Sequence, residues 1–567
     1  MNEDFRKSIP APLEAIPFDI PRPYETELAN GLKIIIVEDS RHPIVTMRLA
    51  FRSGEIDDPK GLNGLTSAMT ELLNEGTGKY SSRELAERIE NLGANLSVSA
   101  GLDNTLVRAS TLSAYRGEVL DLIAELVLRP TFPENELNLY KQNAIEGLKY
   151  QRSQPDFLAD EQMAKAVYGD HPYGTNSPNE KEIEKITRDE IIELHKRKFI
   201  PNNATLIAIG DVRSETFENE IEGLFGEWKK GEVEQANLPA PPERAERELT
   251  IVDRPGSSQA NIVLSNLAIS RNDPDYFRVL VMNQILGAGA SSRLFMNLRE
   301  EKGYTYGAYS RIYAKRHLGS FEATSEVRTA VTGESLKEFF YELDRIRNEK
   351  PSEDELIDAK NFLSGVFPIR AETQGGLTNL IVAQMLYDLP DDYLQTYREK
   401  VNAVTGEEVQ RVANKYVLPD QIAMVIVGDA EAVLPQAREF AQNIEIVDAK
   451  GKPKSMEIFE NDPSAPTMDI GGAWALSIDF QGQKMPVTLV LEQDGDSISG
   501  KMESMIGEGE VQNGSVKGNK ISASVSSDFQ GQSIELIFKG TVDGDSMTGT
   551  ISTSMIPAPM EFAGKRT

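Results

Sequence analysis

The chain has 567 residues, of which 40% are hydrophobic and 26% are charged, and its formal net charge is -29. This length predicts several globular domains, and the acidic excess argues against nucleic acid or anionic lipid as the main partner, because phosphate recognition needs a basic face. The chain contains no Cys, which excludes disulfides and thiolate metal sites, and we find no apolar run long enough to cross a bilayer.

The chain begins with a segment, residues 1–24, that is rich in Pro and has no apolar core of the signal-peptide type. It predicts an extended arm rather than a folded element. Two origins fit it: a mature secreted chain whose leader is absent, or a cytoplasmic protein with a Pro-rich tail.

Two later segments indicate an internal duplication. Residues 187–212 read TRDEIIELHKRKFIPNNATLIAIGDV, and residues 405–430 read TGEEVQRVANKYVLPDQIAMVIVGDA. Their Thr, Pro and Asp landmarks are separated by one interval, 218 residues (405 - 187, for example). Two copies at this distance predict two homologous globular halves rather than a short-period solenoid.

Each half has the same predicted layout. A pair of strands opens the copy, at Leu32–Glu38 and Val45–Arg52 in the first and at Leu249–Asp253 and Ala260–Asn266 in the second, and helices and a strand ending in Gly-Asp follow. This order predicts an α+β fold with helices packed on mixed, mostly antiparallel sheets. We place the halves at residues 25–228 and 249–447, joined by a Pro-bearing linker at 229–248.

Residues 61–77 read GLNGLTSAMTELLNEGT, and their apolar positions recur at helical spacing, which predicts a buried helix ended by Gly76. The frame resembles the zinc-site helix of the insulinase/pitrilysin peptidases, in which two His of an H-x-x-E-H motif bind zinc and the Glu activates a water. Gly64, Ser67 and Ala68 stand at those three positions here. None of them can bind zinc or act as a general base at neutral pH, so this helix has lost the chemistry that the resemblance implies.

The family's third zinc ligand is a Glu on a later helix. Counting back from Pro155, Gly147 takes its place here, and the neighbouring Glu146 is a poor substitute because one residue turns a side chain by about 100° on a helix. Glu71 is better explained as a solvated charge at the helix end than as a replacement base. No two of the four His have the i, i+4 spacing that holds a metal on one helical face, although carboxylates remain able to bind a hard cation such as calcium.

The second half keeps a different motif. Residues 284–309 read QILGAGASSRLFMNLREEKGYTYGAY, which closely resembles the family's substrate-clamping segment, where an Arg and a Tyr seven residues later reach toward the scissile bond. Arg299 and Tyr306 have that spacing. The resemblance implies that Arg299 holds substrate backbone and that Tyr306 donates to the developing oxyanion. On the spacing alone, a surface ion-pair residue beside Glu300 and Glu301 and a packed strand aromatic would be the better explanation, and it is the surrounding GAGASSRL-F-x-N-LRE-x-G frame that favours the clamp.

The loss of the zinc motif together with an intact Arg/Tyr clamp has a precedent in the family, where one chain supplies H-x-x-E-H and another supplies Arg and Tyr. The resemblance therefore implies a heterodimer with an H-x-x-E-H partner, an extended peptide substrate, no zinc on this chain and no activity without the partner. The alternating segment Ala94–Ser110 predicts an edge strand, which in the family pairs with substrate backbone. Its candidate contacts are Ser97, Ser99, Gly101 and Asn104.

The C-terminal region differs in composition. A polar linker at residues 448–472 precedes residues 473–567, where DFQGQ and DGDS each recur after 49 residues (528 - 479 and 543 - 494). The Asp-Gly-Asp sequences predict hairpin turns rather than calcium loops, because the ligand series of a calcium loop is missing. The strands around them predict a small antiparallel barrel, and Trp474, Phe562 and Arg566 faintly resemble lipocalin-like domains. Such a barrel would bind an apolar ligand or an envelope component, or add a docking surface.

Three functional hypotheses follow. The chain is a non-catalytic subunit of a two-chain zinc peptidase, a stand-alone peptide-binding module, or a structural assembly subunit in which the clamp is dispensable. We favour the first, and from the family resemblance we expect a periplasmic or secreted protein, with a cytoplasmic one as the alternative.

Overall fold

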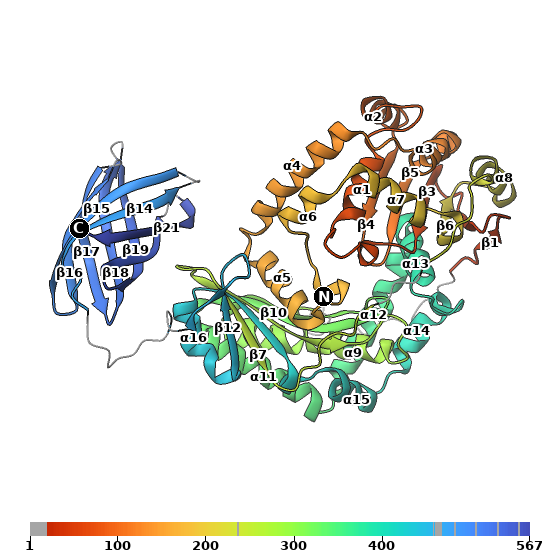
Figure 1. Ribbon diagram of the computed structural model, residues 1–567. Coiled ribbons are helices and arrows are strands. Elements are labelled where there is room, and N and C mark those ends of the chain that lie inside the picture. Colours follow the sequence, from red (N-terminus) through yellow and green to blue (C-terminus); the bar gives the residue numbers. More distant parts are fainter. Residues whose placement is uncertain are drawn as a thin grey trace, which may run out of the picture.

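The computed structural model describes residues 20–234, 238–456, 459, 468–480, 483–504, 507–529, 532–553 and 556–567. Most of the predicted N-terminal arm, residues 1–19, lies outside these ranges. The described residues form two mixed sheets covered by helices and one closed barrel (Figure 1). The predicted α+β class with a C-terminal barrel is therefore confirmed.

The first sheet has the strand order β1-β2-β6-β3-β5-β4. Its strands are β1 (Tyr24–Glu27), β2 (Lys33–Glu38), β3 (Ile44–Phe51), β4 (Asn95–Ala100), β5 (Thr105–Leu112) and β6 (Ala204–Gly210). Only β2 and β6 run parallel, and β6 is buried along its whole length, which explains its apolar run LIAI. The helices of this half are α1 (Leu65–Leu73), α2 (Ser82–Asn91), α3 (Arg116–Leu128), α4 (Glu134–Gln151), α5 (Pro155–Tyr168), α6 (Glu180–Lys185), α7 (Arg188–Lys198) and α8 (Ser214–Phe225).

The second sheet has the order β13-β12-β7-β11-β8-β10-β9. Its strands are β7 (Glu248–Asp253), β8 (Gln259–Ala268), β9 (Thr305–Tyr313), β10 (Gly319–Arg328), β11 (Ala423–Gly428), β12 (Asn443–Val447) and β13 (Pro453–Lys454). The run β7-β11-β8-β10-β9 repeats the run β2-β6-β3-β5-β4, again with one parallel pair, as the internal duplication predicted. The helices are α9 (Tyr276–Leu286), α10 (Arg293–Phe295), α11 (Thr332–Asn348), α12 (Glu353–Glu372), α13 (Gln374–Leu386), α14 (Tyr393–Ala403), α15 (Gly406–Tyr416) and α16 (Ala430–Ala437).

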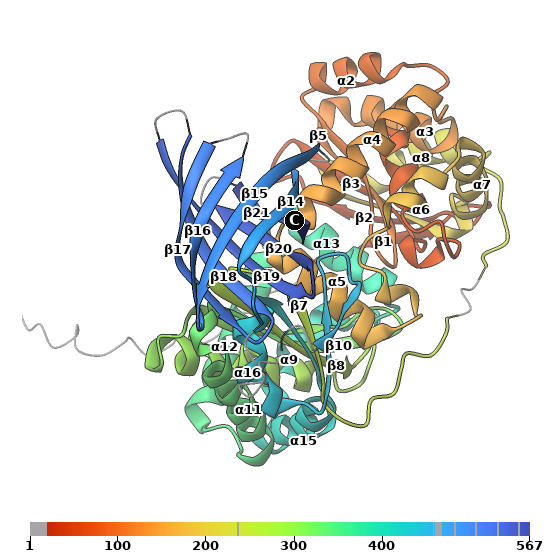
Figure 2. The same cartoon turned by 60° about the vertical axis from the view of Figure 1, so that its left-hand side comes forward.

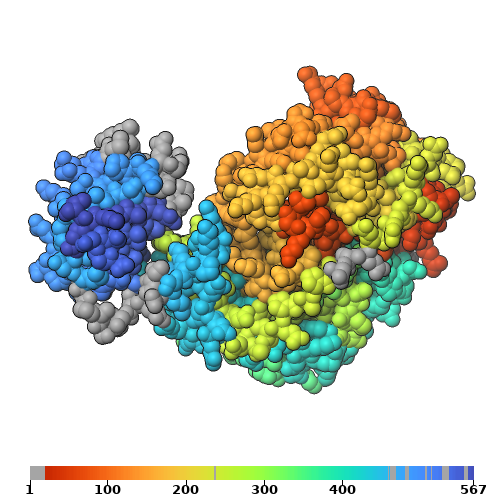
Figure 3. All heavy atoms as spheres, in the orientation of Figure 1, coloured from red at the N-terminus to blue at the C-terminus, as the bar shows by residue number. Residues whose placement is uncertain are grey.

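One helix of each half packs on the sheet of the other half. Helix α5 of the first half packs on β8 and β11 of the second sheet, where Leu158 joins Val263 and Val425 in one apolar cluster. Helix α13 of the second half packs on β3 and β6 of the first sheet, where Ile381 joins Ile207. Figure 1 shows both crossings, and Figure 3 shows the halves closed against each other. Each sheet therefore needs the other half to cover its second face.

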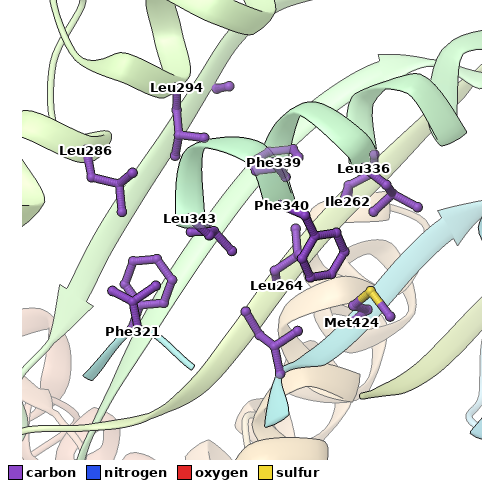
Figure 4. Packing of buried hydrophobic residues seen from close by; sticks show 14 of the residues in the cluster. Ile262, Leu264, Leu286, Leu294, Phe321, Leu336, Phe339, Phe340, Leu343 and Met424 are labelled. Carbon is purple, nitrogen blue, oxygen red and sulfur yellow. The ribbon is translucent and has the colours of Figure 1, made fainter. Parts of the chain in front are cut away.

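The opposite face of each sheet carries a conventional apolar core. In the second half, Phe321 of β10 and Leu294 of α10 lie with Phe339 and Leu343 of α11, all at 0% exposure (Figure 4). Burying one such side chain contributes roughly 1.5–3 kcal/mol, so these layers fix the sheet that carries the predicted clamp.

The barrel closes when β14 pairs with β21. Its strands are β14 (Gly472–Phe480), β15 (Gln483–Asp494), β16 (Ser497–Ser504), β17 (Gly507–Lys517), β18 (Lys520–Phe529), β19 (Gln532–Asp543), β20 (Ser546–Thr553) and β21 (Ile556–Arg566). Gly495 and Gly544 take left-handed φ values of 60° and 58° at the two Asp-Gly-Asp turns, so these sequences form hairpins as predicted. Trp474 is fully buried, and its Nε1 donates to the Ile470 carbonyl at 2.9 Å.

The barrel lies beside the second half (Figure 2). Lys539 Nζ lies 3.5 Å from Asp429 Oδ2, at the start of α16. The second sheet extends into the segment interpreted as a linker, because β13 pairs with β12, while residues 457, 458 and 460–467 lie outside the described residues. Among the helices of the described ranges, none combines the length and the apolarity needed to span a membrane.

Candidate functional site

Helix α1 begins too late to present the first position of the vacated motif. Gly64 is its N-cap, at φ 88°, and the helix proper runs from Leu65 to Leu73, three residues short of the predicted end at Gly76. A Cβ at Gly64 would lie 3.0 Å from Pro178 Cγ. Ala68, one turn later, is fully buried in the apolar core. A larger side chain at either position would therefore have to displace its neighbours.

The polar groups around the start of α1 are committed to holding the helix. Ser67 Oγ donates to Glu55 Oε1 at 2.6 Å. Asp58 accepts from the backbone N–H groups of Gly64, at 2.8 Å, and Thr66, at 2.9 Å, and so takes the place of the cap that the N-cap glycine cannot supply. Burial raises the pKa of Asp58 to about 7. Within the described ranges, no three His, Asp or Glu side chains are arranged to hold a metal ion.

The position on helix α4 that corresponds to the family's third zinc ligand does not face this site. Gly147 is exposed, and a Cβ built on it would meet no atom within 4 Å. Its neighbour Glu146 is exposed and pairs with Lys149 at 2.8 Å. The α4 residue whose electrostatic environment includes this region is Tyr140, whose pKa is raised by burial and then by the charges of Glu71, Glu55 and Asp58. Of the two α4 positions that the sequence suggested, neither Gly147 nor Glu146 is thus shown to serve this site.

The two clamp residues differ in how they are held. Arg299 lies in a π-helical turn, Met296–Glu301, where its Nη1 is 3.1 Å from Glu300 Oε1 and its guanidinium is 4.7 Å from the Phe295 ring centroid. Tyr306, at the start of β9, is 91% exposed. No hydrogen bond or ring contact joins Arg299 to Tyr306 in the described structure. The tyrosine hydroxyl is therefore available to a group outside this chain.

Each sheet ends in an edge strand, and Tyr306 lies on that of the second sheet. Strand β4 is the edge of the first sheet and β9 is the edge of the second. The prediction of one edge strand over Ala94–Ser110 is wrong: the segment is a hairpin, and only β4 is at the edge, because β5 lies between β4 and β3. Ser97 and Ser99 are on β4, and Ser99 Oγ accepts from the Arg108 guanidinium.

Gly101 and Asn104 fall in the turn of this hairpin rather than on the edge. The Gly101 N–H donates to the Asn104 carbonyl at 2.7 Å, and the Gly101 carbonyl accepts from the Glu55 N–H at 3.0 Å. Gly54 packs so closely on the turn that a Cβ there would lie 2.3 Å from the Gly101 oxygen. The turn is thus anchored to the segment that leads into α1.

The same turn meets the second half. Asp103 accepts from the Arg316 backbone N–H at 3.2 Å and from the Tyr173 hydroxyl, and that hydroxyl in turn accepts from the His317 N–H at 3.4 Å. His171 Nδ1 accepts from the Tyr173 N–H at 3.1 Å, which explains the His-Pro-Tyr-Gly sequence as a local cap. These contacts join the β4–β5 turn to the β9–β10 turn and hold the halves together.

A group of ionisable side chains on the inner face of the second sheet was missed from sequence. Arg311 of β9 faces Glu322 of β10, and Asp160 comes from α5 of the first half. Burial and the Asp160 charge raise the pKa of Glu322 to about 7, and Arg311 opposes them. Burial lowers the pKa of Lys315 to about 8. The alternation of side chains along a strand could have predicted that Arg311 and Glu322 share one face of the sheet. The sequence gives no sign that α5 of the first half packs against that face.

Comparison with known proteins finds two family models that match segments from both halves. A family model described as "Insulinase (Peptidase family M16)" matches residues 33–179, and one described as "Peptidase M16 inactive domain" matches residues 185–363. "Uncharacterized zinc protease YmxG" of Bacillus subtilis is 23% identical over 402 residues, which are 70% of this chain and 96% of that protein. "Non-peptidase homolog YmxG" of Helicobacter pylori is also 23% identical, over 70% of this chain and 93% of that one.

Solved structures agree on the architecture. A crystal structure of a peptidase M16 inactive domain from Pseudomonas fluorescens is 29% identical, with a TM-score of 0.68 over 72% of this chain and 98% of that one. A protease from Helicobacter pylori, 20% identical, has the same fold, with a TM-score of 0.67 over 72% of this chain and 100% of that one. The chain is a homologue of the insulinase (M16) peptidase family that carries, in addition, a C-terminal eight-stranded β-barrel.

Proposed function

We propose that this chain is the non-catalytic, substrate-binding subunit of a heteromeric zinc peptidase that acts on peptides or unfolded protein segments. A partner bearing H-x-x-E-H binds the zinc, and this chain supplies Arg299 and Tyr306. The observation that carries the proposal is a contrast between the halves. The three motif positions are filled by a left-handed Gly64, a bonded Ser67 and a buried Ala68, whereas Tyr306 is 91% exposed.

The exposed clamp suits a shared site. In a developing tetrahedral intermediate, a Tyr306 hydroxyl would donate to the oxyanion, and Arg299 would hold a substrate carbonyl. The ion pair of Arg299 with Glu300 has both side chains more than 40% exposed, at 44% and 48%, so replacing it with substrate costs little, about 0–1 kcal/mol. Zinc and the general base come from the partner in this scheme.

The open edge of β4 offers backbone groups to an extended peptide, with Ser97 and Ser99 along it. Pairing of this kind recognises main chain, so we expect loose sequence specificity. We take the C-terminal barrel to be lipocalin-like, and in it the Arg566 guanidinium lies 5.0 Å from the centroid of the buried Trp474 ring. We assign the barrel an accessory role, as a surface that docks the complex to an envelope component.

The experiment is reconstitution. The chain, a homologous H-x-x-E-H protein and their equimolar mixture are each given an unstructured fluorogenic peptide and zinc. A mixture containing Arg299→Ala/Tyr306→Phe is the test arm. A mixture containing Tyr341→Phe is the matched control, because Tyr341 is an exposed tyrosine, 54% accessible, on α11. Hydrolysis by the wild-type and Tyr341→Phe mixtures, lost in the double variant, supports the proposal. Equal hydrolysis by the double variant would mean that the clamp is dispensable and that the chain is a structural subunit.

A stand-alone peptide-binding module is the second candidate. The name of the Helicobacter pylori relative, "Non-peptidase homolog YmxG", favours it, since that name describes a protein without hydrolysis. Peptide bound by the pure chain, without hydrolysis in any mixture, would select this candidate.

A further inference from the structure

The edge strand β9 contains a β-bulge at Tyr306. Along most of its length, as far as the pair Ala308–Ser325, β9 pairs with β10 in a single register. The register then shifts by one residue, so that Val327 lies opposite Thr305. Without the shift, the residue opposite Val327 would be Tyr306. Two residues of β9 therefore oppose one residue of β10 at this point, which is the arrangement of a β-bulge.

The bulge changes the side of the sheet on which Tyr306 lies. Directly paired residues share one face, and Ala308 and Val327 are both fully buried on the side of the apolar core. In an unbroken register Tyr306, two residues before Ala308, would lie on that side too, because side chains alternate along a strand. With the shift it lies on the opposite side and is 91% exposed. The bulge thus accounts for the exposure of the clamp tyrosine.

Two hydroxyl groups hold the bulge in place. Thr305 Oγ1 donates to the Glu326 carbonyl at 2.6 Å and accepts from the Gly307 N–H at 3.1 Å. Ser325 Oγ donates to the Gly307 carbonyl at 2.9 Å. These bonds give partners to backbone groups at the point where the pairing of the two strands is interrupted, and so favour the shifted register.

The fold itself does not require this bulge. Strand β4 is the edge strand of the first sheet and corresponds to β9 in the duplicated strand order. It pairs with β5 without a shift from Asn95 to Ala100. The bulge is therefore a feature of the strand that carries the predicted clamp, and bulges often redirect a side chain beside a functional site.

We propose that Thr305 and Ser325 are positioning residues for Tyr306, because their hydroxyls fix the bulge that turns the tyrosine out of the core side of the sheet. The inference rests on the proposed role of Tyr306 in peptide hydrolysis with a zinc-binding partner. Neither hydroxyl contacts the substrate in this scheme. Each acts through the backbone of β9, and its loss lets the phenol leave the position from which it donates to the oxyanion.

Nitration of the full-length chain alone tests the positioning without a partner. The chain is treated with tetranitromethane, and mass spectrometry of its peptides measures the nitration of Tyr306 relative to that of Tyr341, an exposed tyrosine on α11. Thr305→Val keeps the shape of the side chain but removes the hydroxyl, and should lower this ratio at least about 2-fold. Thr305→Ser restores the hydroxyl and should retain the wild-type ratio. Ser325→Ala should lower the ratio in the same direction.

The matched control is Thr329→Val. The Thr329 hydroxyl also donates to a backbone carbonyl, that of Ser257 at 2.8 Å, but it lies outside the bulge. This variant should keep the wild-type nitration ratio.

Kinetics in the mixture with the H-x-x-E-H protein test the consequence for hydrolysis. Thr305→Val should lower kcat about 10- to 100-fold and change KM by less than about 3-fold, because Tyr306 acts on the transition state rather than on the bound substrate. Thr305→Ser should have a kcat close to that of the wild type, and so should Thr329→Val.

Thermal melting identifies variants that do not fold, and Ser325→Ala, which removes a single bond, decides the outcome if Thr305→Val is among them. Unchanged nitration of Tyr306 in the folded variants, or unchanged kcat in a mixture that hydrolyses the peptide, would overturn the inference and leave the proposed function standing. A wild-type mixture without hydrolysis would instead contradict the proposed function, and the nitration ratio would then decide whether the hydroxyls position Tyr306.

Discussion

Replacing Glu322 with glutamine is expected to stabilise the protein at alkaline pH and to matter much less at acidic pH. Glu322 lies on β10 with Arg311 opposite on β9, and the Tyr313 hydroxyl is 3.5 Å from its Oε1. Burial, followed by the charge of Asp160, raises the pKa of Glu322 from its ordinary value of 4.5 to about 7. The folded protein therefore favours the protonated side chain, which glutamine imitates in size and polarity.

The sign and size of the effect follow from linkage. Because the folded pKa is the higher one, the stability contributed by protonation is fully present below about pH 4.5 and is lost as the pH rises toward 7. One pKa unit corresponds to about 1.4 kcal/mol, so the penalty grows to about 3 kcal/mol above pH 7 and is about 1 kcal/mol at pH 5. Glu322→Gln should therefore exceed the wild type by about 3 kcal/mol at pH 8 and by about 1 kcal/mol at pH 5.

Urea unfolding, followed by circular dichroism at both pH values, measures these differences. The matched control is Glu326→Gln, an exposed position on the same strand, which should change neither value by more than about 0.5 kcal/mol. A difference between Glu322→Gln and the wild type that is the same at pH 5 and pH 8 would refute the reasoning, because a neutral packing effect has no pH dependence.

Three further substitutions test other parts of the account. Ile381→Ala, on the helix that crosses onto the first sheet, should cost roughly 2–5 kcal/mol and lower one shared thermal transition rather than split it. Glu355→Ala should lower the free energy of unfolding, measured with urea, by roughly 3 kcal/mol, because Arg293, whose side chain is 4% exposed, loses its bidentate partner. Equal stability of the variant and the wild type would show that the pair contributes nothing. Restoring the two zinc-binding histidines, as Gly64→His/Ala68→His, should lower the melting temperature and bind no zinc by calorimetry, since the first position is left-handed and the second is fully buried.

The sequence was sufficient for the architecture because its signals are local or repeated. Apolar alternation and the common 218-residue interval predicted two similar halves, and each Asp-Gly-Asp turn predicted a hairpin. The predicted edge strand was too long because Gly101–Asn104 continues the alternating sequence pattern. In the structure this segment is a turn, held by contacts with Gly54 and Glu55, about 50 residues earlier.

The candidate site was only partly readable. Motif positions such as Gly64 and Tyr306 can be located from the residues around them in the sequence. How exposed their side chains are cannot be predicted in this way. The Glu322 group depends on Asp160, which α5 brings from the other half. Such pairs are separated by more than a hundred residues and follow from packing between helices and sheets, which no periodicity records.

The most direct test of the central claim, that this chain has lost zinc chemistry, is to measure zinc and hydrolysis on the same purified sample. The chain alone is incubated with excess zinc, desalted, analysed for metal by atomic emission and assayed with an unstructured peptide. We predict less than stoichiometric zinc and no hydrolysis that a chelator abolishes. One zinc per chain, with peptide hydrolysis that is lost on chelation and regained when zinc returns, would contradict the account.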